Sequence, residues 1–297
     1  MSRVTDFHLP DGRALSFDDV GPPDGWPIFY FHGVPSAATE WHMWADEDLF
    51  RDTHSRLVAV DRPGTGSSSF QPDRRLSDWP RDIEALADGL GIGRFSVLGY
   101  SGGGPYAAVC AARLPGRVAS AALVSSLASF ALPGMTDGLV PNNVRFLRLA
   151  LDRPWLYRLL FRQLRLTARL APKRYLKLAL AAFEEPDRSV FARPTVHAAI
   201  FAAAGSSRGQ QLDTGLVIGP WDFGLDEVQG SVRLWHGDLD RNASLAMFRH
   251  LAGSIPNSIG RLLPAEGHIS LIVNHASEIL GALVRAAKQS ESQRSAA

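Results

Sequence analysis

A chain of 297 residues with 45% apolar side chains is long enough for one large α/β domain with an insertion, or for two domains. Its net charge of +1 argues against nucleic acid as the main partner, and its one cysteine, Cys110, excludes an intramolecular disulfide and a thiolate metal cluster. The first residues lack the apolar segment of a secretion signal, and no apolar run is long enough to span a bilayer. We therefore expect a cytoplasmic protein with no transmembrane segment.

Short apolar runs alternate with helical segments along much of the chain. The runs that we expect to form strands are residues 4–9, 13–20, 27–31, 57–60, 94–98, 118–124, 232–235 and 259–263. The segments with helical character are residues 77–90, 105–113, 244–252 and 272–287. This alternation predicts an α/β fold with a mostly parallel central sheet and helices on both faces. The dipeptide Asp11-Gly12 is a hairpin signal that makes the first edge antiparallel.

The alternation stops within residues 130–225, where the periodicities are helical and no convincing strand is found. Since the α/β pattern resumes at Ser231, we interpret this segment as a helical cap inserted into one fold. Residues 1–129 and 226–287 then form the core. The polar residues 288–297 are expected to be a disordered tail.

The inserted segment is strongly basic. Residues 141–183 hold eight arginines and two lysines against one aspartate, a local charge of +9 that leaves −8 on the rest of the chain. Arg158, Arg162, Arg165 and Arg169 share one face of a helix by their spacing. We expect a solvated surface of the cap, with anionic lipid, an acidic partner or an acidic substrate as the alternatives. An oligomer formed through the cap also stays open.

A glycine-flanked serine stands between a predicted strand and a predicted helix. The pattern Gly99-x-Ser101-x-Gly103 in this setting is the context of a nucleophile elbow. Side chains at Gly99 and Gly103 would collide with the neighbouring strand and helix, so the turn leaves the serine backbone strained and its hydroxyl exposed. At this helix N-terminus the N–H of Gly102 can point at a developing negative charge.

Several residues that carry chemistry follow directly on the ends of predicted strands. They are His32, Asp61, Ser101, Asp240 and His268. In a parallel sheet the carboxyl ends of the strands lie at one edge, where ligands and catalytic groups gather. The sequence therefore predicts that these side chains belong to one site.

The motifs occur in an order that resembles the α/β-hydrolase superfamily. Ser101, Asp240 and His268 follow one another along the chain, with a His-Gly-Val-Pro segment from residue 32 and an Asp-Arg-Pro-Gly segment from residue 61. The resemblance covers roughly residues 10–287. The Ser-Gly-Gly-Gly-Pro-Tyr block at the serine is similar to that of lidded bacterial esterase-like serine hydrolases. The resemblance implies an α/β-hydrolase fold with an inserted cap and a Ser-His-Asp triad.

The roles of the three residues follow from their chemistry. Ser101 is a weak nucleophile until a base takes its proton, and His268 is that base and afterwards the acid for the leaving group. Asp240 would accept the ring N–H of His268, which fixes the tautomer and stabilises the imidazolium. The resemblance places the acid at Asp240, and reach favours it over Asp238, which is closer to the strand end and is expected to order the turn.

The oxyanion of the reaction needs backbone donors. We expect the N–H of Gly102 and, by resemblance, that of Val34 to hold it. His32 is expected to order the loop before Val34 through backbone hydrogen bonds. Asp61 and Arg62 are interpreted as a buried or half-buried pair that orders the next loop.

Aromatic residues near the predicted site could line an apolar pocket for an acyl or alcohol group, with ordinary packing between cap and sheet as the alternative. The candidates are Trp41, Trp44, Phe130, Trp155 and Trp221. The sequence contains no set of histidine, aspartate and glutamate residues at the spacing of metal ligands, and no glycine-rich phosphate loop. We therefore expect no metal and no cofactor.

These features together predict a cofactor-independent serine hydrolase that acts on a carboxylic ester through an acyl-enzyme. The partner would be a small-molecule substrate with an apolar acyl or alcohol part. Two classes of alternative stay open. One is an amidase or aminopeptidase, a carbon–carbon hydrolase or a lyase on the same triad. The other is a ligand receptor that kept the fold without catalysis.

Overall fold

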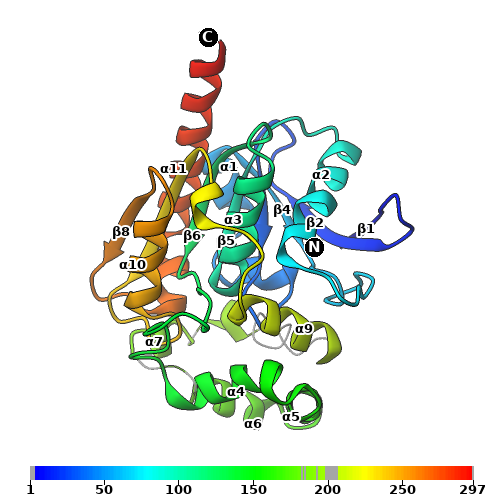
Figure 1. Cartoon of the computed structure of the whole chain (residues 1–297), viewed down its shortest axis with the longest axis vertical. Coiled ribbons are helices and arrows are strands. Elements are labelled where there is room, and N and C mark those ends of the chain that lie inside the picture. Colours follow the sequence, from blue (N-terminus) through cyan, green and yellow to red (C-terminus); the bar gives the residue numbers. More distant parts are fainter. Residues whose placement is uncertain (1–3, 182, 184, 192, 198–206, 296–297) are drawn as a thin grey trace.

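The computed structural model describes residues 4–181, 183, 185–191, 193–197 and 207–295, and its centre is an eight-stranded sheet (Figure 1). The strands are β1 (Thr5–His8), β2 (Ala14–Val20), β3 (Trp26–Phe31), β4 (Ser55–Val60), β5 (Phe95–Tyr100), β6 (Val118–Val124), β7 (Ser231–Gly237) and β8 (Ile259–Leu263). Their order across the sheet is β1-β2-β4-β3-β5-β6-β7-β8, with β2 antiparallel to both of its neighbours and all other pairs parallel. The predicted hairpin and the mostly parallel sheet are both confirmed.

Helices cover both faces of the sheet because its central strands are apolar on both sides. Strands β5 and β6 are buried along their whole length. One face carries α2 (Trp79–Gly89), α3 (Gly104–Arg113) and α10 (Leu245–Ser254), and the other carries α1 (Glu47–Thr53) and α11 (His268–Ser295). Short 3-10 turns are η1 (Ala38–Met43), η2 (Leu76–Asp78), η3 (Ser101–Gly103) and η4 (Leu225–Glu227). Each face therefore has its own hydrophobic core.

The last helix is longer than the sequence predicts. Residues 288–295 continue α11, so the prediction of a disordered tail over these residues is wrong, while residues 296 and 297 lie outside the described range. Arg94 forms an ion pair with Glu291 and donates to Ser290 Oγ at 3.2 Å, which anchors the end of the helix to the core. By length and composition α11 could cross a membrane, but 67% of its most apolar stretch is buried. Its apolar face is thus accounted for by packing on the sheet.

The insertion between β6 and β7 is a helical cap. Its helices are α4 (Pro141–Asp152), α5 (Pro154–Leu170), α6 (Pro172–Leu180), α7 (Asp187–Val190) and α9 (Ser207–Ile218), and its described residues contain no strand. The expected insertion is confirmed, although residues 198–206 of it lie outside the described range. Proline opens α4, α5 and α6, where its missing N–H and fixed φ suit the first helical position. Figure 1 shows α4, α5 and α6 at the end of the molecule opposite the C-terminus.

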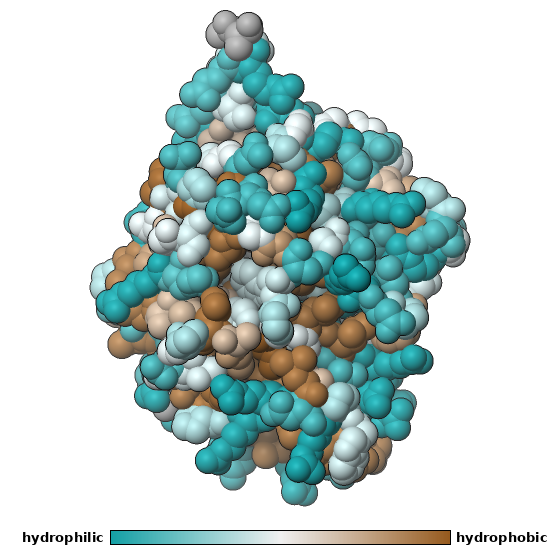
Figure 2. All heavy atoms as spheres, viewed as in Figure 1, coloured by the Kyte–Doolittle hydropathy of each residue, from teal (hydrophilic) through white to brown (hydrophobic). Residues whose placement is uncertain are grey.

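The outer surface of the cap mixes basic and apolar side chains. The arginines at positions 162, 165 and 169 of α5 are exposed, as the helical spacing predicts. Large apolar side chains are also exposed on α5, among them Trp155, Leu166 and Leu170. Figure 2 shows hydrophilic residues over much of this end of the molecule, with apolar residues between them.

A buried ionic cluster fastens the cap to the core. Asp213 of α9 accepts from Arg62 Nε and Arg74 Nη2, each at 2.7 Å, and from the Tyr106 hydroxyl at 2.5 Å. All four side chains are buried. Burial alone would raise the pKa of Asp213, but Arg62 and Arg74 outweigh it and hold that pKa well below its usual range. Asp61 and Arg62 are both buried and both order loops, as expected, and the carboxylate that pairs with Arg62 is Asp213 of the cap.

The backbones of cap and core also approach closely beside this cluster. A Cβ atom at Gly209 of α9 would lie 2.0 Å from the carbonyl oxygen of Gly64. Only a residue without a side chain fits there, so α9 can come close enough for Asp213 to reach the two guanidinium groups.

Replacing Asp213 by alanine is expected to destabilise the protein by about 3–5 kcal/mol, because it leaves two buried guanidinium groups without their counter-ion. Chemical denaturation measures the change in the free energy of unfolding. Asp152→Ala on the exposed end of α4 is the matched control and should cost less than about 0.5 kcal/mol. Equal effects of the two substitutions would contradict the assigned role of Asp213.

Candidate active site

Ser101 stands at a sharp turn between β5 and α3. Its backbone has φ 53°, a left-handed conformation that is uncommon for a serine. A Cβ at Gly103 would lie 1.9 Å from the carbonyl oxygen of Phe31, and a Cβ at Gly99 would lie 2.3 Å from that of Gly103. The flanking glycines are thus required by the close approach of strand and helix, and the strained elbow predicted from the sequence is present.

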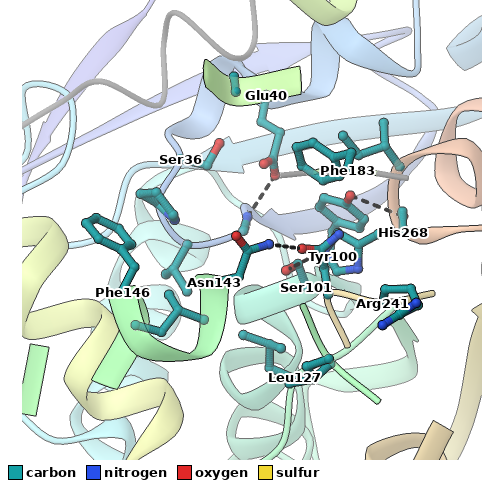
Figure 3. Close-up of a pocket in the computed structure, with 18 of the residues that line it drawn as sticks. Ser36, Glu40, Tyr100, Ser101, Leu127, Asn143, Phe146, Phe183, Arg241 and His268 are labelled. Carbon is teal, nitrogen blue, oxygen red and sulfur yellow. Dashed lines mark hydrogen bonds between the residues drawn. The ribbon is translucent and has the colours of Figure 1, made fainter. Parts of the chain in front are cut away.

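Three side chains from the carboxyl ends of β5, β7 and β8 form a hydrogen-bonded chain. His268 Nε2 lies 2.9 Å from Ser101 Oγ, and His268 Nδ1 lies 2.8 Å from Asp240 Oδ2. All three residues are buried, and Figure 3 shows Ser101 and His268 facing each other at the cavity. With its proton on Nδ1, the imidazole donates to Asp240 and accepts from the serine hydroxyl.

The acid loop holds one aspartate toward the histidine and the other away from it. Asp240 Oδ1 accepts the backbone N–H groups of Asn242 and Ala243, each at 2.8 Å, so its second oxygen is aimed at His268. Asp238 accepts instead from the N–H of Ala265 at 2.8 Å. The geometry expected for these two aspartates is therefore observed.

The opposite charges of His268 and Asp240 shift the pKa values of both residues. Burial of His268 opposes its protonation, but the Asp240 carboxylate outweighs burial and raises the pKa of His268 above its ordinary value of 6.5. Burial likewise acts to raise the pKa of Asp240, but the neighbouring His268 lowers it below its ordinary value. Asp240 therefore stays ionised and stabilises the imidazolium that forms when His268 accepts a proton as a base.

The loop after β3 is held rigidly beside the serine. Arg62 donates to the carbonyl oxygens of His32 at 2.6 Å and Gly33 at 2.8 Å, and Glu40 Oε2 accepts the N–H of Gly33 at 2.8 Å. His32 Nδ1 lies 2.8 Å from the Gly33 oxygen, the backbone contact expected of it. Burial and the adjacent Arg62 lower the pKa of His32 well below its ordinary value, so this histidine is neutral.

Val34 and Gly102, the two predicted oxyanion donors, are neighbours. A Cβ at Gly102 would lie 2.3 Å from Val34 Cγ2, so the absence of a side chain at Gly102 lets the loop close over the elbow. Val34 and Ser101 both line the same cavity. Their N–H groups as an oxyanion hole remain a prediction that this arrangement allows.

A cavity of about 320 Å³ opens onto Ser101 and His268 between core and cap. Its lining is largely apolar. Cap residues in this lining include Val144, Phe146, Leu147, Leu164, Leu178 and Phe183. Asn143 of α4, which donates to Asn242 Oδ1 at 2.6 Å, and Arg241 beside the triad acid add polar groups at the rim (Figure 3). The site can therefore hold a small ligand with an apolar part against the serine.

The model of a protein family described as alpha/beta hydrolase fold matches residues 27–275 of the chain. This chain belongs to the alpha/beta hydrolase family. Over 121 residues it is 37% identical to a non-heme chloroperoxidase of Streptomyces lividans, and over 119 residues 34% identical to a bifunctional esterase/perhydrolase of Acinetobacter calcoaceticus. Each alignment covers 39% of this chain and 42% of the relative, so this chain matches less than half the length of either curated protein.

Solved structures share the whole fold of this chain. A bromoperoxidase from Bacillus anthracis superposes with a TM-score of 0.71 at 18% identity, covering 97% of this chain and 100% of the other. The esterase RhEst1 from Rhodococcus sp. superposes with a TM-score of 0.67 at 22% identity, covering 97% and 98%. At these identities the likeness shows the fold alone.

The aromatic residues predicted to line the pocket lie elsewhere, and that prediction is wrong. Trp41 and Trp44 are buried in the hydrophobic core on the α11 side of the sheet. Phe130 and Trp221 pack against the opposite core, and Trp155 is 59% exposed on the outside of the cap. None of the five lines the cavity at Ser101. For Trp155, helical spacing alone could not tell which face of α5 turns toward the serine, and the other four lie outside the cap helices.

Three buried carboxylates around the site carry no signal in the sequence. Asp213 reaches Arg62 from the cap, and Asp187 contacts the backbone at His268. Glu40 lines the cavity and accepts the Tyr30 hydroxyl at 2.5 Å, while burial raises its pKa. Each looks like an ordinary surface residue in the sequence, because its partners are brought to it only by the fold. Within the described residues no group of three or more metal-ligating side chains is found.

Replacing Asp240 by asparagine is expected to lower ester turnover by about 10³–10⁴-fold, because the amide favours the wrong tautomer of His268. The pH profile of kcat/KM gives a second readout. In the parent protein its rising limb should lie above pH 6.5, since the base works only after losing its proton. Without the Asp240 charge the pKa of His268 falls, so the limb should move to lower pH.

Asp238→Asn is the matched control for this experiment, because the Asp238 carboxylate accepts from the N–H of Ala265 and not from His268. It should leave turnover within about threefold of the parent and the limb in place. If Asp238→Asn were the crippling change and Asp240→Asn nearly silent, the assignment of the acid would be wrong.

Proposed function

We propose that the protein is a cofactor-independent serine hydrolase acting on carboxylic esters. The single observation that carries the proposal is the chain of hydrogen bonds from Ser101 Oγ through His268 to Asp240, at 2.9 and 2.8 Å. A serine at a strained elbow, next to a histidine held by a buried carboxylate, is the arrangement that acyl transfer requires. The curated esterase/perhydrolase and the esterase structures among the similar proteins support the ester assignment.

The reaction would proceed in two halves. Ser101 Oγ attacks the ester carbonyl while His268 Nε2 takes the hydroxyl proton, and the backbone N–H groups of Gly102 and Val34 hold the oxyanion. Collapse of the tetrahedral intermediate breaks the bond between the acyl carbon and the alcohol oxygen, and the alcohol leaves with the proton from His268. Water then attacks the acyl-enzyme, giving its proton to His268, and the acid departs as Ser101 regains its hydroxyl proton.

The size and lining of the cavity support one class of substrate. Its volume of about 320 Å³ lies at the small end of ligand pockets, and its cap lining is apolar. Glu40 is the acidic side chain among the described lining residues, and its Oε2 already accepts from Tyr30 and Gly33. This favours a small ester with an apolar acyl or alcohol part over a peptide whose terminal ammonium needs a carboxylate to bind it.

Labelling by a fluorophosphonate probe tests the nucleophile. The parent protein should be labelled stoichiometrically and Ser101→Ala should not, with hydrolysis of p-nitrophenyl butyrate lost in parallel. Ser292→Ala, on the exposed end of α11, is the matched control and should behave as the parent protein does. Unlabelled parent protein that still binds small esters would favour the receptor alternative.

A panel of substrates tests the type of bond. Turnover of p-nitrophenyl butyrate should exceed that of an amino-acyl p-nitroanilide by at least about 10². The anilide bond resists attack, and the ammonium group of the amino acid finds no free carboxylate among the described residues that line the cavity. A parallel assay of peracid formation from acetate and hydrogen peroxide examines the perhydrolase activity named for one relative. Cleavage of the anilide without turnover of any ester would replace the ester assignment by an amidase or peptidase.

A further inference from the structure

Asp187 of the cap contacts the backbone at the catalytic histidine. Its Oδ2 accepts the N–H of His268 at 2.9 Å, and its Oδ1 accepts those of Ile269 at 2.8 Å and Ser270 at 2.9 Å. These are the first residues of α11, whose N–H groups have no partner within the helix. Asp187 is 3% exposed. The Asp187 carboxylate therefore caps α11, a role that normally belongs to the side chain of the residue just before the helix.

Gly267 makes this contact possible. It occupies the position before α11, from which a side chain would ordinarily cap the helix, and it has none. A Cβ built there would lie 2.5, 2.7 and 2.8 Å from Asp187 Oδ1, Cγ and Oδ2, and these are its three nearest atoms. The absence of a side chain at Gly267 is thus matched to the presence of the Asp187 carboxylate.

Apolar packing docks the same cap segment onto α11. Val190 and Phe191, at the end of α7, are buried in one cluster with Ile269 and Ile272. The ring of Phe183 lies 5.1 Å from that of Phe191, between centroids, and Phe183 also lines the catalytic cavity. A substrate that fills the cavity therefore touches the segment that carries Asp187.

The backbone of His268 is consequently held on both sides. Its N–H is bound by the cap, and its carbonyl oxygen accepts the hydroxyls of Tyr100 and Ser125, each at 3.2 Å. With the backbone fixed, the orientation of the imidazole is set by its hydrogen bonds to Ser101 and Asp240. Of these backbone contacts, that with Asp187 is lost if α7 leaves the core.

We propose that Asp187 is a positioning residue through which docking of the cap completes the catalytic site. With α7 docked, the N-terminus of α11 is capped and His268 Nε2 is held toward Ser101. With α7 undocked, three backbone donors lose their acceptor and the histidine loses its fixed placement. The inference rests on the proposed function, because it takes Ser101, His268 and Asp240 as the reacting groups.

The charge of Asp187 gives this role a measurable signature. Charged and titratable groups approach His268 from several elements: Asp240 after β7, Asp187 on α7, Glu40 on η1, Tyr100 on β5 and His236 on β7. Asp240 is the strongest of those that raise the pKa of His268, and Asp187 and Glu40 add to it. Removing the Asp187 charge therefore lowers that pKa, which a purely structural contact would not do.

The experiment compares Asp187→Asn with the matched control Asp152→Asn, an exposed aspartate of the same cap. Active sites are titrated to the endpoint with a fluorophosphonate, and kcat and KM for p-nitrophenyl butyrate are measured across pH. Asp187→Asn should lower kcat per titrated site by about 10–100-fold with KM within about threefold, and its rising pH limb should move to lower pH. The control should match the parent protein. An unchanged kcat per site with an unmoved limb would overturn the proposal, even if thermal stability fell.

A second pair of variants reaches the same contact from the other side. Gly267→Ala should displace Asp187 and lower kcat as Asp187→Ala does. If both act through the one contact, the double variant should be no worse than Asp187→Ala, because removing the carboxylate removes the clash. Independent, multiplying losses would overturn the proposal. Failure of the triad itself would show separately, as hydrolysis that survives Ser101→Ala in the parent background.

Discussion

Arg62 is a fully buried guanidinium on which three segments depend. It donates to the carbonyl oxygens of His32 and Gly33 in the loop after β3, it lies in the loop after β4, and it pairs with Asp213 of cap helix α9. A buried charge without a partner is very costly, so this cluster forms only when the cap is docked on the core. The placement of the loop beside Ser101 and the placement of the cap are therefore one event.

The same logic recurs on the opposite side of the serine. Asp213 is linked through Arg62 to the loop that carries the expected oxyanion donor Val34, and Asp187 contacts the helix that carries His268. In each case a carboxylate of the cap meets donors of the core in a buried setting. Gly209 lets the backbones of cap and core come close, and Gly267 leaves room for the Asp187 side chain. The cap is thus fastened at two points, one on each flank of the reacting groups.

This arrangement explains how an apolar cavity can coexist with a charged catalytic chain. The apolar lining comes largely from α4, α5 and α6, while the carboxylates that hold the cap lie on α7 and α9. The first group gives the pocket an apolar wall, and the second keeps the buried charges paired. A hydrolytic site of the proposed kind needs both, since low polarity strengthens the hydrogen bonds within the triad and toward the oxyanion.

The amino-acid sequence was enough to predict the core and the groups proposed to react. Apolar runs buried on both faces predict the parallel strands, and Gly99 and Gly103 predict the elbow because no other residue fits beside them. Strand ends at one edge then bring Ser101, Asp240 and His268 together. The pocket and the contacts that support it could not be predicted before the fold was known. Trp155 fits either face of a helix by spacing, and Asp187 and Asp213 find their donors 81 and 151 positions away, so their roles exist only once the cap has folded over the sheet.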